Sequence, residues 1–420
     1  MTQPPALTVV YPLDPMGPKV GGSVSFIRGL IQHAPAAMRL RFIGVSCDAE
    51  QRPPLRWQAA QTSGRAFEFL PILVEPHEDQ RRLLPLSLRF VQRLRSSMLA
   101  DDGAVLVHNR PETLLAAGMG RRRNIVFLHN DVPAQIGAGP SEVLWSRFPR
   151  LYYRFESHVF GRADQVYTVS SNTLADCLQR YPDWPDKFGF VPTWVDSERF
   201  ALADAPKALL RARLAARHPA IAPQAPWLLY VGRLQPQKAP QRLLDAFALL
   251  RAHQPQAQAH LIVIGDGNLR AAVEDQVRRL GLQACTHLLG AVPQADLPDY
   301  YQAADALLLA SDFEGMPMCV LEALACGLPV VSTRVGEVAR VVLPGKTGEL
   351  AAALTADALC QALCTLLARA GARGTTYDPR ACAAAVQPYG PRQVLAPVYA
   401  RIAALAQTGN TATRRTGVVL

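Results

Sequence analysis

Hydrophobic and polar positions alternate along the chain in two patterns, which predict two kinds of element. Short, almost continuous apolar runs are typical of strands that are covered on both faces of a sheet. Such runs occur at residues 7–11, 40–45, 67–73, 227–231 and 306–310. The segments between many of them carry apolar residues every three or four positions, the spacing of an amphipathic helix. This alternation predicts an α/β fold with parallel sheets and helices on both faces.

Chain length indicates how many domains this pattern forms. At 420 residues the chain is longer than one ordinary domain, and length alone favours two or three. We expect an N-terminal domain at residues 1–200, a short linker, and a second domain at residues 206–387. A last helix is predicted at residues 388–406. The small polar tail at residues 407–420 is expected to be disordered.

One stretch, residues 309–331, joins a strand end, a bent loop and a helix around two carboxylates. Glycine and proline interrupt the apolar pattern after Glu314, and helical spacing starts near Met318, which puts Glu322 one turn into the helix. Free N–H groups at a helix N-terminus favour anions, so we expect a phosphate against residues 315–319. The alternative for each glutamate, taken alone, is a solvated or paired residue.

The first strand of each predicted domain is followed by a loop that suits a ligand. In the first domain, Gly21 and Gly22 allow the backbone to approach a ligand closely. In the second, Arg233 and Lys238 lie between a strand and a helix. Isolated surface charges are usually only solvated, but a guanidinium together with a mobile ammonium neutralises a diphosphate well. We therefore interpret these two cations as a candidate diphosphate site.

Two histidines end predicted strands in the N-terminal half. His108 is followed by Arg110, and His129 is followed closely by Asp131. The carboxyl ends of parallel strands face the ligand crevice of such sheets, which favours a functional role. A hydrogen-bonded structural role is the alternative for each imidazole ring.

The formal net charge of +10 draws the surface toward anions such as nucleic acid, nucleotide substrates or acidic lipid. Residues 80–100 carry five arginines, interleaved with leucines, and no acidic residue. Residues 145–165 form a second basic stretch, in which aromatic side chains lie between the arginines. One interpretation is an amphipathic surface that lies on an anionic membrane. The other is a core-packed helix with solvated arginines. Because there are two such basic patches, we expect membrane contact.

The location of the protein is also predicted from its hydrophobic pattern. No apolar run approaches the roughly 18 residues that a membrane span needs. The N-terminus lacks the basic-then-apolar layout of a signal peptide. We therefore expect a cytoplasmic protein that is peripheral on the inner face of the cell membrane.

Eight cysteines are scattered along the chain without a C-x-x-C pair. Cys360 and Cys364 lie one helical turn apart, a spacing that suits a metal. No second pair and no histidine near them in the sequence completes a site. We therefore expect buried free thiols and no metal.

The stretch around the two glutamates resembles the E-x7-E signature of the retaining family-4 glycosyltransferases (glycosyl transferases group 1), with Glu314 and Glu322 in the two places. The pattern A-x-A-x-G-x-P-V-V, which follows in the family, is matched as well. The two cations of the second domain match the family's G-R-x4-K element, although Ala239 stands where glycine is common. The resemblance covers nearly the whole chain.

The resemblance implies a GT-B fold, in which two doubly wound Rossmann-like domains face each other across a cleft and a C-terminal helix crosses back to the N-domain. It also implies retaining transfer of a hexose from a UDP-sugar or GDP-sugar, a co-substrate rather than a cofactor, to a saccharide acceptor. The basic patches lead us to expect an acceptor linked to polyprenyl diphosphate. Such an enzyme would serve cell-surface polysaccharide or lipopolysaccharide synthesis.

The resemblance further implies roles for single residues. Glu314 and His129 are expected to be catalytic, and Glu322 is expected to bind the ribose. The other expected contacts are Glu314, Gly315, Met316 and Pro317 for the donor sugar; Arg233, Lys238, Gly22, Met318 and Cys319 for the donor diphosphate; and Gly21, His108, Arg110 and Asp131 for the acceptor side. The sequence departs from the family's His-Asp element, because Asn130 intervenes.

Metal independence is expected because the chain contains no D-x-D, the carboxylate pair that holds a metal-nucleotide complex in another transferase architecture. Two rival functions are compatible with parts of the sequence. A sugar-nucleotide epimerase of the same fold would form product without an acceptor, and the E-x7-E pattern argues against it. A basic nucleic-acid-binding protein is suggested by charge alone, without an aromatic-basic motif or zinc spacing, so we expect no nucleic-acid partner.

Overall fold

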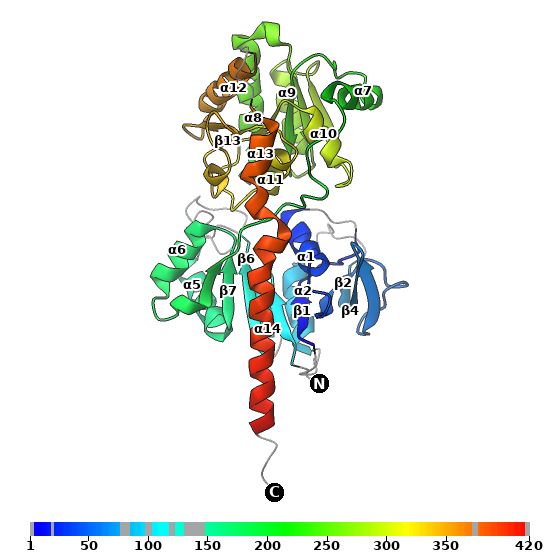
Figure 1. Ribbon diagram of the computed structural model, residues 1–420, viewed down its shortest axis with the longest axis vertical. Helices are drawn as coiled ribbons and strands as arrows, with labels where there is room; N and C mark the ends of the chain where they lie inside the picture. The colour runs from blue at the N-terminus through cyan, green and yellow to red at the C-terminus, as the bar shows by residue number, and fades with distance from the viewer. Residues whose placement is uncertain are drawn as a thin grey trace. The chain divides into compact units, whose positions relative to one another are not determined.

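The computed structural model describes residues 4–17, 21–75, 85–96, 103–116, 122–129, 148–371 and 377–415. The chain forms two compact units, each built on its own sheet (Figure 1). Unit 1 comprises Met1–Pro192 and Pro391–Leu420, and unit 2 comprises Thr193–Gly390. The first boundary therefore falls at residue 192 rather than at the expected 200. The reason is packing, since Val195 and Phe200 are buried in the core of unit 2.

Unit 1 contains an eight-stranded sheet in the order β3-β4-β2-β1-β5-β6-β7-β8. Its strands are β1 (Ala6–Val10), β2 (Arg39–Ser46), β3 (Gln58–Thr62), β4 (Arg65–Val74), β5 (Val105–His108), β6 (Arg123–Leu128), β7 (Gln165–Thr168) and β8 (Phe188–Phe190). All pairs are parallel except β3 with β4. The sequence pattern missed β3, because this edge strand alternates half-buried and exposed residues and has no apolar run.

Helices connect these strands, as the apolar spacing predicted. They are α1 (Gly22–Gln32), α2 (Leu86–Ser96), α3 (Pro111–Ala116), α5 (Pro149–Arg162), α6 (Ser171–Arg180), the 3-10 helix η2 (Pro185–Lys187) and α14 (Pro391–Arg415). The last helix, α14, belongs to unit 1. The Tyr399 hydroxyl donates to the Leu30 carbonyl at 2.8 Å, and Arg401 Nε donates to Gln165 Oε1 at 3.0 Å. This helix continues to Arg415, so the expectation of a disordered tail from residue 407 does not match the structure.

Unit 2 contains a six-stranded, fully parallel sheet in the order β11-β10-β9-β12-β13-β14. Its strands are β9 (Trp227–Val231), β10 (His260–Ile264), β11 (Thr286–Gly290), β12 (Ala306–Leu309), β13 (Val330–Thr333) and β14 (Gly348–Ala351). Its helices are α7 (Lys207–Arg217), α8 (Pro240–His253), α9 (Arg270–Arg279), α10 (Leu297–Ala303), α11 (Met318–Ala325), α12 (Ala356–Gly371) and α13 (Pro379–Ala385). Short 3-10 helices are η3 (Pro236–Lys238), η4 (Pro255–Ala257), η5 (Val338–Arg340) and η6 (Gln387–Tyr389).

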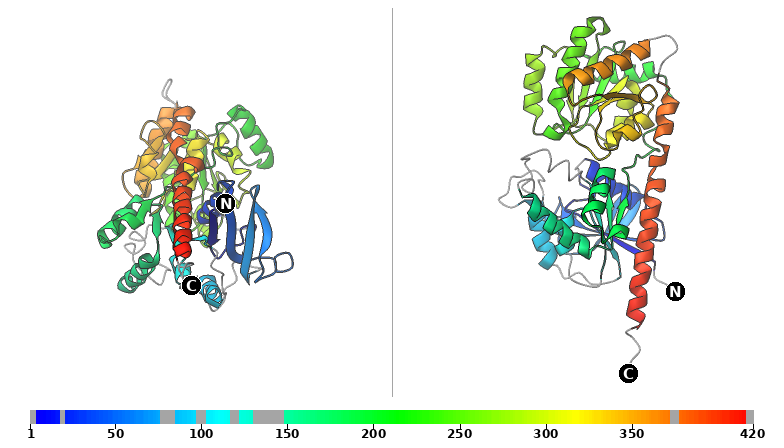
Figure 2. Two further views of the ribbon diagram at one scale, coloured as in Figure 1. Left: turned by 60° about the horizontal axis from the view of Figure 1, so that its bottom comes forward. Right: turned by 90° about the vertical axis from the view of Figure 1, so that its left-hand side faces the viewer.

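Two hydrophobic cores cover the two faces of the sheet in unit 2. Successive residues of β9 point to opposite faces, as the two-residue period of a strand requires. Trp227 and Leu229 enter the core that contains α7, α10, α11 and α13, whereas Leu228 and Tyr230 enter the core that contains α8, α9 and α12. Figure 2 shows this unit from two further directions. Helices on both faces of a parallel sheet confirm the predicted doubly wound arrangement.

Strand order places the ligand-binding edge of each sheet. In unit 2 the chain leaves β9 toward β10 and β11 on one side and returns through β12 on the other. In unit 1 the same reversal occurs between β1 and β5. Ligands of doubly wound sheets bind at such switch points, outside the carboxyl ends of the strands. No helix in the ranges given above is long and apolar enough to span a membrane.

Candidate active site

Lys238 and Glu314 come together at the switch point of unit 2. Lys238 lies on the loop after β9, and Glu314 lies on the loop after the neighbouring strand β12. Lys238 Nζ is 2.5 Å from Glu314 Oε1, and the Ser311 hydroxyl donates to the same oxygen at 2.8 Å. Only 7% of Glu314 is exposed. The structure therefore brings together the G-R-x4-K and E-x7-E elements, whose Lys238 and Glu314 lie 76 positions apart in the sequence.

Hydrogen bonds between the two loops hold them together. The backbone N–H of Asp312 donates to the Gln237 carbonyl at 2.9 Å, and the Gln237 side-chain amide donates to the Phe313 carbonyl at 2.9 Å. Ala239, which follows Lys238, adopts a left-handed conformation with φ of 42°. That conformation explains why glycine is common at this place, since a left-handed backbone costs a residue with a side chain about 1–2 kcal/mol. The sequence pattern did not identify Gln237 as part of the site.

The charged side chains around Lys238 and Glu314 determine the electrostatics of this site. Burial alone would lower the pKa of Lys238, but the Glu314 carboxylate outweighs it and raises that pKa. Lys238 is therefore a cation at neutral pH. Arg233 is exposed, and its positive charge is close enough to Lys238 to oppose that rise in pKa. Arg242, on α8, pairs with Asp312 at 2.6 Å. The three cations Arg233, Lys238 and Arg242 therefore outnumber the two carboxylates of these loops, Asp312 and Glu314, as a diphosphate site requires.

Contacts with neighbouring elements position the loop that carries Glu314. The Thr333 hydroxyl donates to the Ser311 carbonyl at 2.7 Å, and Arg242 Nη1 donates to the Ala310 carbonyl at 2.8 Å. The backbone N–H of Glu337 donates to the Gly315 carbonyl at 2.8 Å. The loop after β12 is thus held by the helix α8 on one side and by the segment after β13 on the other.

Helix α11 starts beside this loop, at Met318. Its N-cap residue, Pro317, offers no side-chain cap, and its first turn has no acidic residue. Such a start favours an anion. Met316 and Cys319 are buried in the core of unit 2, and burial raises the pKa of the Cys319 thiol to about 12. The thiol is therefore neutral, and the roles of these residues toward a donor stay predictions.

Glu322 is buried on α11 and contacts a tyrosine. Tyr301, on α10, donates its hydroxyl proton to Glu322 Oε2 at 2.7 Å, and only 6% of Glu322 is exposed. Burial raises the pKa of Glu322 to about 7, although the bond from Tyr301 and the positive charge of Arg199 oppose the rise. The sequence alone did not connect Tyr301 to Glu322.

We expect Glu322 to make stability depend on pH. Its folded-state pKa of about 7 lies above the ordinary value of 4.5, so the folded protein holds this proton to higher pH than the unfolded chain. The free energy of unfolding should therefore fall as pH rises from about 4.5 to 7, by up to about 3 kcal/mol from this group. Urea unfolding of a Glu322→Gln variant should lose this dependence. An unchanged pH profile in the variant would contradict the assignment.

In unit 1, His129 lies at the end of β6 and is half-buried. Its Nε2 atom is 2.7 Å from Asn109 Oδ1, and its ring packs edge-on against Phe26 with 4.5 Å between centroids. Burial lowers the pKa of His129 to about 4, so the ring is neutral at pH 7. Gly21 caps α1 with φ of 140°, a backbone conformation that favours glycine, and Gly22 is the first residue of that helix.

The other candidates of unit 1 have different surroundings. His108 is fully buried, with Nδ1 at 2.9 Å from the Thr113 hydroxyl and Nε2 at 3.2 Å from Asn124 Oδ1. These contacts fit the structural interpretation of His108. The guanidinium of Arg110 is 3.2 Å from Glu112 Oε1 and lies over the Tyr11 ring. Asp131 lies outside the described residues.

The two basic patches also differ from each other. In α2, Phe90 and Leu94 are buried in the core of unit 1, and Arg89 pairs with Glu75 at 2.5 Å. These contacts match the alternative of a core-packed helix, although residues 80–84 and 97–100 lie outside the described part. At α5, Phe148 and Leu151 are 57% and 59% exposed. This second patch therefore presents apolar side chains on the surface beside exposed arginines at positions 150 and 154.

Comparison with known families accounts for both units. The family described as Glycosyltransferase Family 4 matches residues 20–199, and the family described as Glycosyl transferases group 1 matches residues 225–369. The chain belongs to the family-4 glycosyltransferases. The resemblance drawn from the E-x7-E and G-R-x4-K patterns is therefore confirmed.

Relatives of this family-4 chain are known by sequence and by structure. D-inositol 3-phosphate glycosyltransferase 2 of Catenulispora acidiphila is 33% identical over 204 residues, which cover 47% of this chain and 46% of the relative. The chain spans about half the length of the curated relatives it matches.

Solved structures match over almost the full length. Sucrose-phosphate synthase from Thermosynechococcus elongatus superposes with a TM-score of 0.71 at 19% identity, covering 98% of this chain and 99% of the other. HepE of Anabaena, in complex with UDP and glucose, superposes with a TM-score of 0.70 at 17% identity, covering 95% and 99%. At these identities the likeness concerns the fold, and it confirms the expected GT-B architecture.

Proposed function

We propose that this chain is a retaining glycosyltransferase, which transfers a hexose from a nucleotide-diphosphate sugar to a hydroxyl of an acceptor. The observation that carries this proposal is the meeting of Lys238 and Glu314 at the carboxyl ends of the adjacent strands β9 and β12. Relatives named as glycosyltransferases support it, and so does HepE, whose structure contains UDP and glucose.

The leaving group of such a transfer is a nucleoside diphosphate. When the bond between the anomeric carbon and the diphosphate breaks, negative charge develops on the leaving oxygen. Arg233, Lys238 and the N-terminus of α11 would stabilise that charge more strongly in the transition state than in the bound donor. The released diphosphate would accept the proton of the attacking hydroxyl, since no strand-end residue within the described ranges is a dedicated nucleophile.

The two glutamates have separate proposed roles. Glu314, held by Lys238 and Ser311, would orient a hydroxyl of the donor sugar. Glu322 would accept hydrogen bonds from the ribose hydroxyls, and its contact with Tyr301 would orient the carboxylate. On unit 1, His129 is proposed to position the sugar or the acceptor, with a neutral ring that can donate at one nitrogen and accept at the other.

The stereochemistry and the metal requirement can be tested in one reaction. The purified protein is incubated with UDP-glucose or a GDP-hexose, an acceptor and a chelator, and the product is analysed by NMR. We expect an α-linked product from the α-configured donor, at a rate that changes less than twofold with the chelator. A β-linked product, or activity lost in chelator and restored by manganese, would contradict the proposal. Conversion of the donor sugar without any acceptor would instead indicate an epimerase.

Two acceptor classes are proposed. The basic surface of unit 1 favours a saccharide linked to polyprenyl diphosphate, and the names of the relatives favour D-inositol 3-phosphate. Initial rates with each acceptor, measured at one donor concentration, discriminate between them. Stimulation by detergent micelles that carry the lipid-linked acceptor supports the first class, and turnover of the soluble polyol phosphate supports the second.

Membrane contact is proposed for α5, through Phe148 and Leu151. Apolar side chains beside arginines bind anionic interfaces, and the attraction weakens with salt. A Phe148→Ser/Leu151→Ser double variant should sediment at least threefold less with phosphatidylglycerol vesicles than the wild type. Equal sedimentation of the double variant and the wild type would remove α5 from the proposal.

A further inference from the structure

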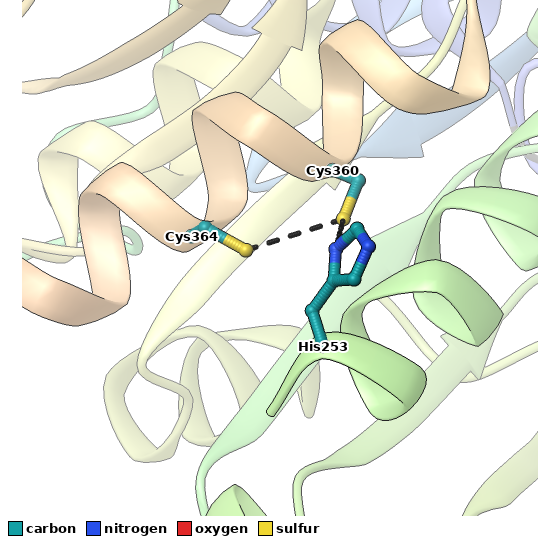
Figure 3. A group of neighbouring side chains, drawn as sticks. All are labelled: His253, Cys360 and Cys364. Carbon is teal, nitrogen blue, oxygen red and sulfur yellow. Dashed lines mark hydrogen bonds between the residues drawn. The ribbon is translucent and has the colours of Figure 1, made fainter. Parts of the chain in front are cut away.

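Three side chains with metal-binding atoms gather between α8 and α12 (Figure 3). His253 is the last residue of α8, and Cys360 and Cys364 lie one turn apart on α12. The sequence pattern found the cysteine pair but no histidine beside it. The structure supplies one, because folding brings His253 from 107 positions away to the sulfur of Cys360.

The distances among these atoms are close to those of a tetrahedral zinc site. Zinc binds cysteine sulfur at about 2.3 Å and histidine nitrogen at about 2.0–2.1 Å, so tetrahedral geometry places two sulfurs roughly 3.8 Å apart and sulfur and nitrogen roughly 3.5 Å apart. Here the two sulfurs are 4.0 Å apart, and Cys360 Sγ is 3.7 Å from His253 Nδ1. All three ligand atoms lie within 4.8 Å of one another. A small movement of the exposed histidine completes the triangle.

The chemistry of the three ligands selects among metals. Two thiolates and an imidazole form a soft donor set, which suits zinc and excludes magnesium and calcium, since these prefer oxygen. Cys360 is buried at the edge of the core, Cys364 is half-buried and His253 is exposed. The site is therefore anchored on the protein side and open to water on the other, which leaves a fourth position for a water molecule.

We propose that His253, Cys360 and Cys364 bind a zinc ion that fastens the end of α8 to α12. Binding replaces the two thiol protons, which pass to solvent, and leaves one water in the fourth position. The alternative is a thiol-imidazole hydrogen bond without metal. Only the zinc site predicts that loss of any one ligand abolishes metal binding.

This site is distinct from the donor loops. Helix α8 has 14 residues and begins at Pro240, two positions after Lys238, so its far end lies roughly 20 Å from the diphosphate site. The zinc ion would therefore stabilise unit 2 without taking part in sugar transfer. Removal of zinc should lower the melting temperature and leave the initial rate at 25 °C unchanged.

The test uses the full chain, purified under reducing conditions and freed of metal. Cobalt replaces zinc as a spectroscopic probe, because a cobalt-thiolate bond produces charge-transfer absorption. We expect one equivalent of Co²⁺ to produce this absorption and excess Zn²⁺ to abolish it. A hundredfold excess of Zn²⁺ over its dissociation constant should raise the melting temperature by about 5 °C.

Variants assign the ligands. His253→Ala and Cys364→Ser alter exposed or half-buried side chains, so both proteins should fold, and both should lose the absorption and the thermal shift. His158→Ala and Cys47→Ser are matched controls with exposed and half-buried side chains elsewhere, and they should keep both signals. Absence of the thiolate absorption in the reduced wild type, or its persistence in His253→Ala, would overturn the zinc site.

Discussion

Replacing Glu314 with glutamine is expected to lower turnover at least a hundredfold while the protein stays folded. The carboxylate accepts from Lys238 and Ser311 and is almost fully buried, so it is rigidly aimed. Loss of a group that positions the reacting sugar typically costs about 10²-fold in rate. Initial rates with a saturating nucleotide sugar measure the effect, and circular dichroism verifies the fold. A loss of no more than threefold would remove Glu314 from the catalytic machinery.

A matched control separates this effect from general damage to unit 2. Glu349, on β14, is also buried and hydrogen-bonded, with the Tyr377 hydroxyl at 2.6 Å and the Gly345 N–H at 3.1 Å. Glu349→Gln removes a carboxylate of similar burial that lies outside the two donor loops. It should lower the melting temperature without changing the turnover number. A similar loss of turnover in both variants would indicate that stability, rather than the position of Glu314, controls activity.

Replacing Gly336 with alanine is expected to displace the loop after β12, which carries Glu314. Gly336 has φ of 47°, and an added Cβ would lie 2.3 Å from the Glu314 carbonyl oxygen and 2.1 Å from that of Gly315. Both contacts are with the backbone that carries the Glu314 side chain, so relief of the clash is expected to displace it. We expect the free energy of unfolding to fall by at least about 2 kcal/mol, because a left-handed alanine costs about 1–2 kcal/mol before the clash is added. Turnover should fall at least tenfold.

Gly281→Ala is the control for backbone strain alone. Gly281 also has positive φ, 67°, but an added Cβ would meet nothing within 4 Å. This variant should lose only about 1 kcal/mol and retain full turnover. If Gly336→Ala resembles Gly281→Ala in both measurements, Gly336 does not support the position of Glu314.

The fold was predictable because each strand-loop-helix unit has its own local pattern. Continuous apolar runs marked β1, β9 and β12, and the interrupted run after β12 marked the loop of Glu314. The edge strand β3 was not predictable in this way, since half of its side chains are exposed and its strand state depends on pairing with β4. The boundary at residue 192 likewise depends on tertiary packing, which no local pattern encodes.

The site was predictable in its charged residues and less so in their partners. Two motifs identified Lys238 and Glu314, but the contacts of Glu322 with Tyr301 and of the loop with Gln237 join positions that are 21 and 76 apart. Hydrogen bonds over such separations leave no periodic signal. For the same reason, the sequence alone did not predict the contact between His253 and Cys360.

The two histidines show how environment decides a role. Both end a parallel strand, so the sequence pattern treated them alike. Within the described residues, His108 contacts a threonine and an asparagine that belong to the unit 1 framework, whereas His129 contacts Asn109 in the loop after β5. Strand position alone could not distinguish the residue that packs inside the fold from the residue beside a loop.

The central claim is that the loops after β9 and β12 bind a nucleoside diphosphate through Lys238. Calorimetric titration with UDP, GDP and ADP, each in the presence of chelator, tests it most directly, with Lys238→Met as the variant and the exposed Lys346→Met as its control. We predict that one of the three nucleotides binds the wild type and Lys346→Met equally, and binds Lys238→Met at least tenfold more weakly. Failure of all three to bind, or equal affinity for Lys238→Met, would contradict the account.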